Sequence, residues 1–238
     1  MTNRPSPSNI RGVLLDIEGT TTPIDFVYSV LFPYARQQLR SCLDALTARS
    51  EGAEALDELR RERARETRAD APRAIEDYAL WLMDEDRKST GLKTLQGLIW
   101  RKGYELGELR GVVFADVAPA LERWHGQERD VRIFSSGSVL AQRLLFSTCP
   151  EGDLTRFIRG YFDTTTGSKK DAASYRVIAQ AFELPPDRIV FVSDLVDELD
   201  AARAAGLATR LALRPGNLKV NDANGHPSIR SFDEISQR

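Results

Sequence analysis

The stretch Gly12-Val-Leu-Leu-Asp16-Ile-Glu18, followed by Gly-Thr-Thr-Thr-Pro23, decides the fold of this chain. Its apolar run, residues 12–15, is continuous rather than alternating, which indicates a strand buried on both faces of a parallel sheet. The glycine, threonines and proline that follow predict a turn directly after the strand. Two acids therefore stand where a buried parallel strand gives way to a loop.

The second half of the chain alternates between strand-like and helix-like patterns. Short apolar or β-prone runs predict further strands at residues 131–135, 161–166, 189–194 and 208–213. Apolar residues at helical spacing predict helices at residues 139–146, 170–183 and 199–205, the last ended by Gly206. Such alternation predicts an α/β fold with a doubly wound, Rossmann-like parallel sheet and helices on both faces.

The segment between the first strand and this second half contains no strand-like run. It is helical in pattern, and its residues 51–68 are almost wholly polar, which is typical of a solvated helix face with ion pairs along it. A basic binding arm is the alternative, but glutamates cancel most of its charge. We therefore expect a flexible tail, an α/β core and an inserted all-helical cap domain. Their ranges are 1–10 for the tail, 11–22 with 116–238 for the core, and 23–115 for the cap.

Composition and charge exclude several classes of protein. The chain has 238 residues, of which 42% are hydrophobic and 29% charged, as is ordinary for a globular protein. Its net charge is −2, with both signs spread along the chain, so we expect no nucleic-acid and no membrane partner. No apolar run approaches the roughly 20 residues of a membrane span, and because the first residues are polar and proline-rich we expect no signal peptide. We expect a cytoplasmic monomer whose partner is a small molecule.

The cysteines and histidines show no metal-type spacing. Cys42 and Cys149 could form one disulfide, but free thiols in a reducing compartment are the favoured interpretation. His125 and His226 stand apart from every motif, so we expect structural or surface roles for them.

Polar residues gather where an open α/β sheet binds its ligands, beyond the carboxyl ends of the strands. They are Asp16, Glu18, Ser135, Ser136 and Asp194 at strand ends, with Lys169 just before a helix. Mg²⁺ takes one or two protein carboxylates, while a lysine and hydroxyl groups suit phosphate. Each element alone is weak evidence, but their combination in one alternating chain predicts a site for a phosphate ester and one Mg²⁺.

Four motifs resemble those of the haloacid dehalogenase superfamily. Asp16-Ile-Glu-Gly-Thr is similar to its Asp-x-Asp-x-Thr motif, with Glu in place of the second Asp. Ile133-Phe-Ser-Ser-Gly-Ser, Lys169 and Ser193-Asp194-Leu-Val-Asp-Glu198 are similar to the other three. More narrowly, the chain resembles the enolase-phosphatases of methionine salvage, also called acireductone synthases, from about residue 11 to 236. The stretches that carry this resemblance are the first motif, Phe134-Ser-Ser-Gly-Ser-Val-x-Ala-Gln, Tyr161-Phe-Asp-Thr-Thr-x-Gly and Arg214-Pro-Gly-Asn.

The resemblance implies a role for each matched residue. Asp16 would be the nucleophile that attacks phosphorus and a Mg²⁺ ligand, and Asp194 the second carboxylate ligand. Glu18 would bind the metal through its backbone carbonyl and keep its carboxyl group free for proton transfer. The substrate would be held by Ser135, Ser136 and Lys169. Lys169 would also be catalytic, because it neutralises phosphate charge.

Two neighbouring residues leave alternatives open. Lys170 competes with Lys169 for the lysine role, although the spacing from Gly167 favours Lys169. Glu198, one helical turn after Asp194, is expected to position Lys169 or a water on the metal rather than to bind the metal directly.

The resemblance also implies a reaction, in which 2,3-diketo-5-methylthiopentyl 1-phosphate is enolised and then dephosphorylated to acireductone. The alternatives are a phosphatase acting on another small phosphate ester, a haloacid dehalogenase, and an inactive binding module. Dehalogenases use the same aspartate without the second acid or Mg²⁺, so Glu18 and Asp194 argue against that alternative. The intact motifs argue against an inactive module.

Overall fold

The computed structural model describes residues 10–47, 50–87 and 89–235. The flexible tail expected at residues 1–10 lies outside the described residues, except for Ile10, which is buried. Across the described ranges, no helix has both the length and the apolar character that a membrane span requires. Cys42 and Cys149 are buried free thiols.

The chain divides into two compact units, an α/β unit of residues 10–26 and 110–235 and a helical unit of residues 27–109. The sequence placed the inserted segment at 23–115, which is a few residues wider at each end. The C-terminal flank belongs to the α/β unit because its backbone is hydrogen-bonded there. The Phe114 amide donates to the Thr21 carbonyl at 2.9 Å, and the Gly111 amide donates to the Thr148 hydroxyl at 3.0 Å.

The α/β unit is built on a parallel sheet, which has six strands within the described residues in the order β3-β2-β1-β4-β5-β6. The strands are β1 (Gly12–Leu15), β2 (Asp130–Phe134), β3 (Gly160–Phe162), β4 (Ile189–Ser193), β5 (Ala208–Ala212) and β6 (Ser228–Ile229). The central strand β1 pairs with both β2 and β4, so that Leu14 lies opposite Arg132 on one side and Phe191 on the other. The strand order reverses beside β1, and ligands of open α/β sheets bind beyond the carboxyl ends of the strands at such a point.

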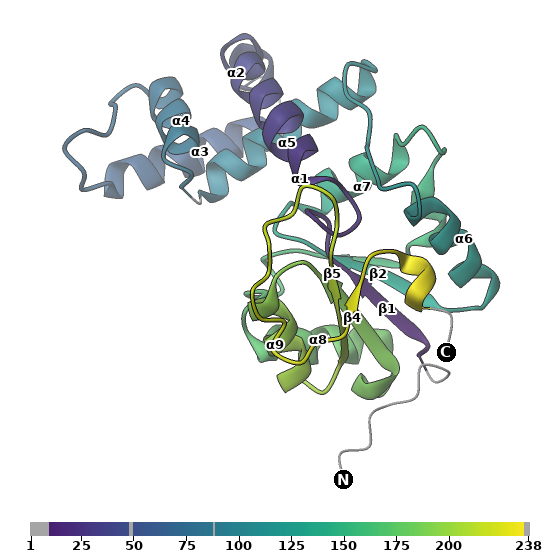
Figure 1. Ribbon diagram of the computed structural model, residues 1–238. Helices are drawn as coiled ribbons and strands as arrows, with labels where there is room; N and C mark the ends of the chain where they lie inside the picture. Colours follow the sequence, from purple (N-terminus) through teal and green to yellow (C-terminus); the bar gives the residue numbers. More distant parts are fainter. Residues whose placement is uncertain (1–9, 48–49, 88, 236–238) are drawn as a thin grey trace. The chain divides into compact units, whose positions relative to one another are not determined.

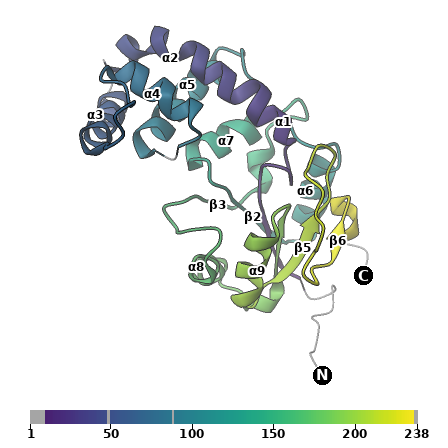
Figure 2. The ribbon, with the colours of Figure 1, turned by 60° about the vertical axis from the view of Figure 1, so that its left-hand side comes forward.

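Helices cover both faces of this sheet. In Figures 1 and 2, α8 and α9 lie next to each other on one face, and α6 lies on the other. The helices of the unit are α1 (Ile24–Phe26), α6 (Val117–Gly126), α7 (Val139–Ser147), α8 (Ala172–Phe182) and α9 (Val196–Ala204), with short 3-10 turns at η3 (Leu154–Phe157), η4 (Pro186–Arg188) and η5 (Phe232–Ile235). The predicted doubly wound, Rossmann-like α/β class is thereby confirmed.

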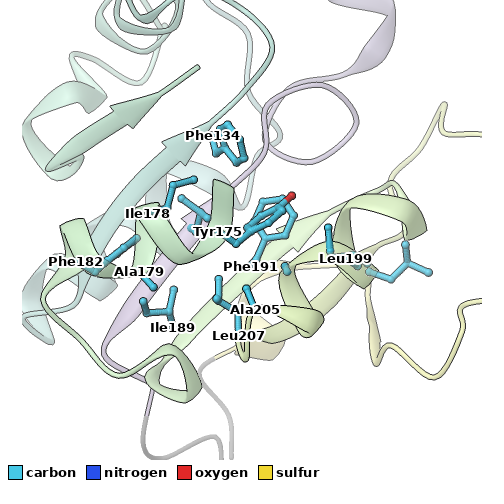
Figure 3. Close-up of a cluster of buried hydrophobic side chains, with 14 residues drawn as sticks. Phe134, Tyr175, Ile178, Ala179, Phe182, Ile189, Phe191, Leu199, Ala205 and Leu207 are labelled. Carbon is cyan, nitrogen blue, oxygen red and sulfur yellow. The ribbon is translucent and has the colours of Figure 1, made fainter. Parts of the chain in front are cut away.

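An apolar layer fills the space between the sheet and helices α8 and α9, as Figure 3 shows. Its centre is the ring of Tyr175, which lies 5.5 Å from the ring of Phe134 and 5.0 Å from that of Phe191. Burial of each such large side chain contributes about 1.5–3 kcal/mol. The layer fixes α8 against the sheet, and with it the loop that precedes α8.

The helical unit contains η2 (Val27–Leu31), one turn of π-helix, and the helices α2 (Phe32–Thr47), α3 (Ser50–Arg65), α4 (Ile75–Asp84) and α5 (Thr90–Glu105). Helices α3 and α5 approach each other closely at Gly91, where an added Cβ would lie 2.7 Å from the Leu59 amide nitrogen. The indole of Trp100 donates to the Leu31 carbonyl at 2.8 Å. Most of the polar stretch predicted at 51–68 lies in α3, which ends at Arg65, buries Leu56 and Leu59 and leaves most of its charged residues on the solvated face.

Helix α6 and strand β6 were not predicted from the sequence. Helix α6 buries residues at helical spacing, a pattern that the sequence contains: Val117, Ala120, Leu121 and Trp124. Strand β6 has only two residues, which is too short for a periodic pattern. The strand expected at 161–166 is shorter, because β3 ends at Phe162 and the threonines form a turn.

Candidate active site

Asp16 and Lys169 meet at the carboxyl edge of the sheet, although 153 positions separate them in the chain. Asp16 directly follows β1, and its Oδ1 accepts a hydrogen bond from Lys169 Nζ at 2.5 Å. The same ammonium group lies 2.7 Å from Glu198 Oε2 on α9. The three side chains are between 3% and 7% exposed, so the ammonium is bound by two carboxylates away from bulk water.

The loop before α8 delivers Lys169 to this position. The buried Tyr175 hydroxyl donates to the Lys169 carbonyl at 2.7 Å, and the Ser174 hydroxyl donates to the Ser168 carbonyl at 2.8 Å. Lys170 points elsewhere, because its ammonium pairs with Asp197 at 2.8 Å in an exposed ion pair. The structure therefore brings Lys169, and not Lys170, to Asp16.

The loop after β1 folds back on itself around Asp16. The Ile17 carbonyl accepts hydrogen bonds from the amides of residues 20, 21 and 22, at 2.9–3.1 Å. The Thr21 hydroxyl donates to the Asp16 carbonyl at 3.1 Å, and the Ile17 amide donates to Asp16 Oδ1 at 2.8 Å. Gly19 has a φ of +68°, a left-handed conformation that glycine adopts without steric cost. The turn predicted after the first strand thus orients the Asp16 carboxylate.

The serines that follow β2 lie beside the second acid. The buried Ser135 hydroxyl contacts Glu18 Oε2 at 3.4 Å and accepts a hydrogen bond from the Gly137 amide at 3.1 Å. Ser136 is exposed at the same turn. Ser138 caps α7 by accepting from the Ala141 amide at 3.3 Å, so this turn leads into a helix N-terminus.

Asp194 lies against the loop after β1. A Cβ added to Gly19 would lie 2.4 Å from Asp194 Oδ2 and 2.9 Å from Asn217 Oδ1. Only a glycine leaves room for these two polar side chains at that point. The residues predicted from the ends of β1, β2 and β4 are therefore brought together at one sheet edge.

Residues 10–206 match the haloacid dehalogenase-like hydrolase family. The chain belongs to this family. Among its relatives, enolase-phosphatase E1 of Synechococcus elongatus is 51% identical over 97% of this chain and the whole of its own length. Enolase-phosphatase E1 of Klebsiella pneumoniae is 47% identical over 95% of this chain and 96% of its own. This level of identity makes the chain a member of the enolase-phosphatase family within the haloacid dehalogenase-like hydrolases.

A solved structure also resembles the chain over nearly its full length. The UTR4 protein of Saccharomyces cerevisiae is 35% identical, with a TM-score of 0.77 over 94% of this chain and 99% of that one. The haloacid dehalogenase-type fold of this family member is thus supported by sequence and by structure.

Charge is unevenly balanced at this edge of the sheet. Four acids, Asp16, Glu18, Asp194 and Glu198, surround the ammonium of Lys169. Burial and the nearby Asp16 carboxylate raise the pKa of Asp194 to about 7 and that of Glu198 to about 7.

The same two causes, burial first and Asp16 second, raise the pKa of Glu18 above its usual range. Burial alone would lower the pKa of Lys169, but the carboxylates of Asp16 and Glu198 outweigh it and raise that pKa. The raised pKa of Lys169 favours its charged form, whereas the raised pKa values of Glu18, Asp194 and Glu198 mean that one ammonium does not fully offset the charge of four buried carboxylates. Such a site favours an additional cation.

In the parts of the chain that the structure describes, no three acidic, histidine or cysteine side chains converge tightly enough to form a complete metal cage. Mg²⁺ does not require one, because it keeps several waters and uses one or two carboxylates. The donor set of Asp16 and Asp194, with excess negative charge around them, fits such an ion.

Sequence reasoning gave no role to two residues that belong to this edge. The Ser193 hydroxyl, at the end of β4, donates to Glu198 Oε2 at 2.9 Å and so helps to orient it toward Lys169. Asn217 donates from Nδ2 to the Gly19 carbonyl at 2.8 Å. The signal for Asn217 was the Arg-Pro-Gly-Asn turn directly after a predicted strand, where ligands of such sheets bind.

Proposed function

We propose that this chain is an enolase-phosphatase that converts 2,3-diketo-5-methylthiopentyl 1-phosphate to acireductone and inorganic phosphate in methionine salvage. The observation that carries the proposal is the contact of Lys169 with Asp16, beside Glu18 and Asp194, in a chain 51% identical to enolase-phosphatase E1. The second candidate is a phosphatase of the same family that acts on another small phosphate ester, because the Asp16–Lys169 pair suits any such ester.

We assign phosphoryl transfer to Asp16. Its carboxylate attacks phosphorus, the bond from phosphorus to the substrate oxygen breaks, and an acyl phosphate forms on Asp16. Water then attacks the same phosphorus, the bond to Asp16 breaks, and inorganic phosphate leaves. Lys169, held 2.5 Å from Asp16, neutralises charge on the phosphate oxygens throughout.

We assign proton transfer to Glu18. Burial and the Asp16 carboxylate raise its pKa, so that its carboxyl group can carry the proton that the departing substrate oxygen needs. Once it has given up that proton, it can accept one from the attacking water. The Ser135 hydroxyl contact at 3.4 Å orients the carboxyl group.

Enolisation before phosphoryl transfer makes chemical sense for this substrate. The carbon that carries the phosphate lies next to a carbonyl, so a base can remove its proton. The departing oxygen is then that of an enolate rather than of an alkoxide. Because an enolate is the weaker base of the two, it is the better leaving group. Glu18 is the base we propose for the carbon, since glutamate reaches one methylene further than the aspartate usual in this motif.

We propose one Mg²⁺ per chain, held by Asp16, Asp194 and the Glu18 backbone carbonyl. When bound, the ion would supply charge neutralisation for the phosphate and an electrophile for the developing enolate. Supporting this assignment are the four acids that surround one ammonium and the pKa of Asp194, which burial and Asp16 raise to about 7.

The decisive experiment measures the two steps separately. Phosphate release is assayed on the diketo-phosphate and on simple sugar phosphates, with Mg²⁺ and with excess chelator. Deuterium uptake from D₂O at the enolisable carbon is followed by NMR in the same samples. We expect both signals only with the diketo-phosphate and Mg²⁺. Faster phosphate release from another ester without deuterium uptake favours the generic phosphatase, and full activity in chelator contradicts the Mg²⁺ assignment.

Substitutions assign the steps to residues. We expect Asp16→Asn to abolish phosphate release and to retain some deuterium exchange, whereas Glu18→Gln should slow both. Asp197→Asn is the matched control, because Asp197 is an exposed acid that pairs with Lys170. Wild-type exchange in Glu18→Gln would show that another group removes the carbon proton.

A further inference from the structure

The turn at residues 214–217, which follows β5, contacts the loop after β1 at two consecutive carbonyl groups. Arg214 Nε donates to the Thr20 carbonyl at 3.0 Å, and Asn217 Nδ2 donates to the Gly19 carbonyl at 2.8 Å. Both carbonyls lie between the Asp16–Glu18 pair and the end of their loop. A segment almost 200 residues away in the chain therefore holds that loop in place.

Arg214 makes this turn a rigid support. Its Nη1 contacts both carboxylate oxygens of Asp116, at 3.0 and 2.9 Å, and donates to the Arg230 carbonyl at 2.9 Å. Its guanidinium lies over the rings of Phe114 and Phe232, at 4.8 and 4.5 Å. A buried guanidinium with this many partners cannot move independently. Arg214 therefore holds the backbone of the turn in place, and with it Asn217, which lies three residues later.

The oxygen of Asn217 has a different environment from its nitrogen. Asn217 Oδ1 is buried and receives no hydrogen bond from any group in the described residues. It lies 2.9 Å from the position of a Gly19 Cβ, and Asp194 Oδ2 lies 2.4 Å from that same position. A buried acceptor that receives no hydrogen bond destabilises the folded protein, because it has lost its hydrogen bonds to water. An acceptor kept at that cost beside Asp194 indicates a hydrogen-bond donor in the working enzyme.

We propose that Asn217 is a positioning residue with two functions: its Nδ2 fixes the Gly19 carbonyl, and its Oδ1 accepts a hydrogen bond from the hydration shell of the divalent cation that Asp16 and Asp194 hold. This inference rests on the proposed function, because it needs a cation at that edge of the sheet. Partners in the outer shell of a metal commonly change metal affinity or activity by roughly 10- to 100-fold.

Two substitutions separate the functions of the two amide atoms. Asn217→Ala removes both the donor and the acceptor. Asn217→Asp keeps an oxygen acceptor beside Asp194 but turns the donor to the Gly19 carbonyl into a second oxygen. Asn221→Ala is the matched control, since Asn221 is an exposed asparagine in the same loop.

The primary readout is calorimetric titration of each full-length variant with Mg²⁺ in the absence of substrate, and the second is the split between kcat and KM. We expect Asn217→Ala to weaken Mg²⁺ binding by roughly 10- to 100-fold and to lower kcat. In Asn217→Asp we expect Mg²⁺ binding at least as tight as in the wild type, with a kcat about 10-fold lower. Asn221→Ala should match the wild type in both.

Each contrary result has a distinct meaning. Wild-type Mg²⁺ affinity in Asn217→Ala overturns the role of Oδ1, and wild-type kcat in Asn217→Asp overturns the role of Nδ2. The second arm stands even if the alanine variant fails to fold, because aspartate preserves the size of the side chain. If the wild-type chain binds no Mg²⁺, the proposed function and this inference are overturned together. If the wild type binds Mg²⁺ and the Asn217 variants behave like it, only this inference is overturned.

Discussion

Two ion pairs, one in the helical unit and one in the α/β unit, lie in opposite environments. In the helical unit Arg36 and Asp84 pair at 2.6 Å with side chains 47% and 58% exposed. In the α/β unit Lys169 and Asp16 pair at 2.5 Å with side chains 7% and 3% exposed. Ion pairs of similar length therefore occur once in contact with water and once almost out of contact with it.

This difference separates ion pairs that accompany folding from those that carry function. An exposed pair contributes about 0–1 kcal/mol, because water already solvates both charges. A buried pair loses that solvation, and its net effect on stability is often unfavourable. Strongly perturbed buried charges cluster at functional sites, although structural pairs such as Arg214–Asp116 are buried too, so a buried ion pair is a better guide to the site than an exposed one.

The sharpest test of this comparison is the pair of adjacent lysines. Lys169→Met leaves buried acids without their cation, so we expect phosphate release to fall by about 100- to 1,000-fold. We also expect a loss of about 3 kcal/mol in the free energy of unfolding, measured in urea without Mg²⁺. Lys170→Met should change neither, because the exposed Lys170–Asp197 pair is solvated on both sides. Equal effects of the two substitutions would contradict the comparison.

A second test uses two glycines with left-handed backbones. Gly19 and Gly152 have φ values of +68° and +102°, so Ala should cost each about 1–2 kcal/mol of stability. Only at Gly19 would the new Cβ collide with a functional carboxylate, that of Asp194; nothing lies within 4 Å at Gly152. We expect Gly19→Ala to lower kcat about 100-fold, and Gly152→Ala to leave it unchanged. A similar loss of kcat in both variants would mean that backbone strain, not contact with Asp194, is responsible.

A third test concerns the buried histidine of the α/β unit. His226 contacts the Thr209 hydroxyl at 2.7 Å and Asp200 at 3.0 Å, and burial lowers its pKa although Asp200 opposes this. A lowered pKa means that the unfolded chain binds the proton more tightly than the folded one. The stabilisation is thus complete above the unfolded pKa of about 6.5 and is lost as the pH falls through the folded value.

Urea unfolding above and below that pH measures this effect. We expect His226→Gln to remove this part of the decline in stability on acidification. His125→Gln keeps His226 and serves as the control. A pH dependence that is the same in His226→Gln and the wild type would assign the decline to other groups.

The smallest effect is expected in the helical unit. Arg36→Gln breaks an exposed pair with Asp84, so the midpoint of urea unfolding should correspond to a loss below about 1 kcal/mol. High salt should reduce even this difference, because it screens exposed charges. A larger loss, or one insensitive to salt, would mean that the pair is less solvated than its exposure indicates.

Particular residues show how far the sequence could predict the site. The continuous apolar runs before Asp16 and Asp194 predicted buried strands, and parallel strands bring their carboxyl ends to one edge. Asn217 lies in the Arg214-Pro-Gly-Asn stretch that resembles the enolase-phosphatases, but its hydrogen bond to the Gly19 carbonyl depends on how two distant loops pack. Likewise, the spacing of apolar residues in the sequence indicates helix α6, whereas the two-residue strand β6 forms only because it pairs with β5.

The sequence by itself determined the alternation of strands and helices, the insertion of a helical segment after β1, and the kinds of polar residue at the strand ends. These follow from local periodicity, which a chain carries before it folds. Only the tertiary structure decided that Lys169 rather than its neighbour contacts Asp16, because the Tyr175 hydroxyl fixes the loop backbone. It also decided that Asn217 and Asp194 share the space beside Gly19, since such contacts depend on the packing of segments far apart in the chain.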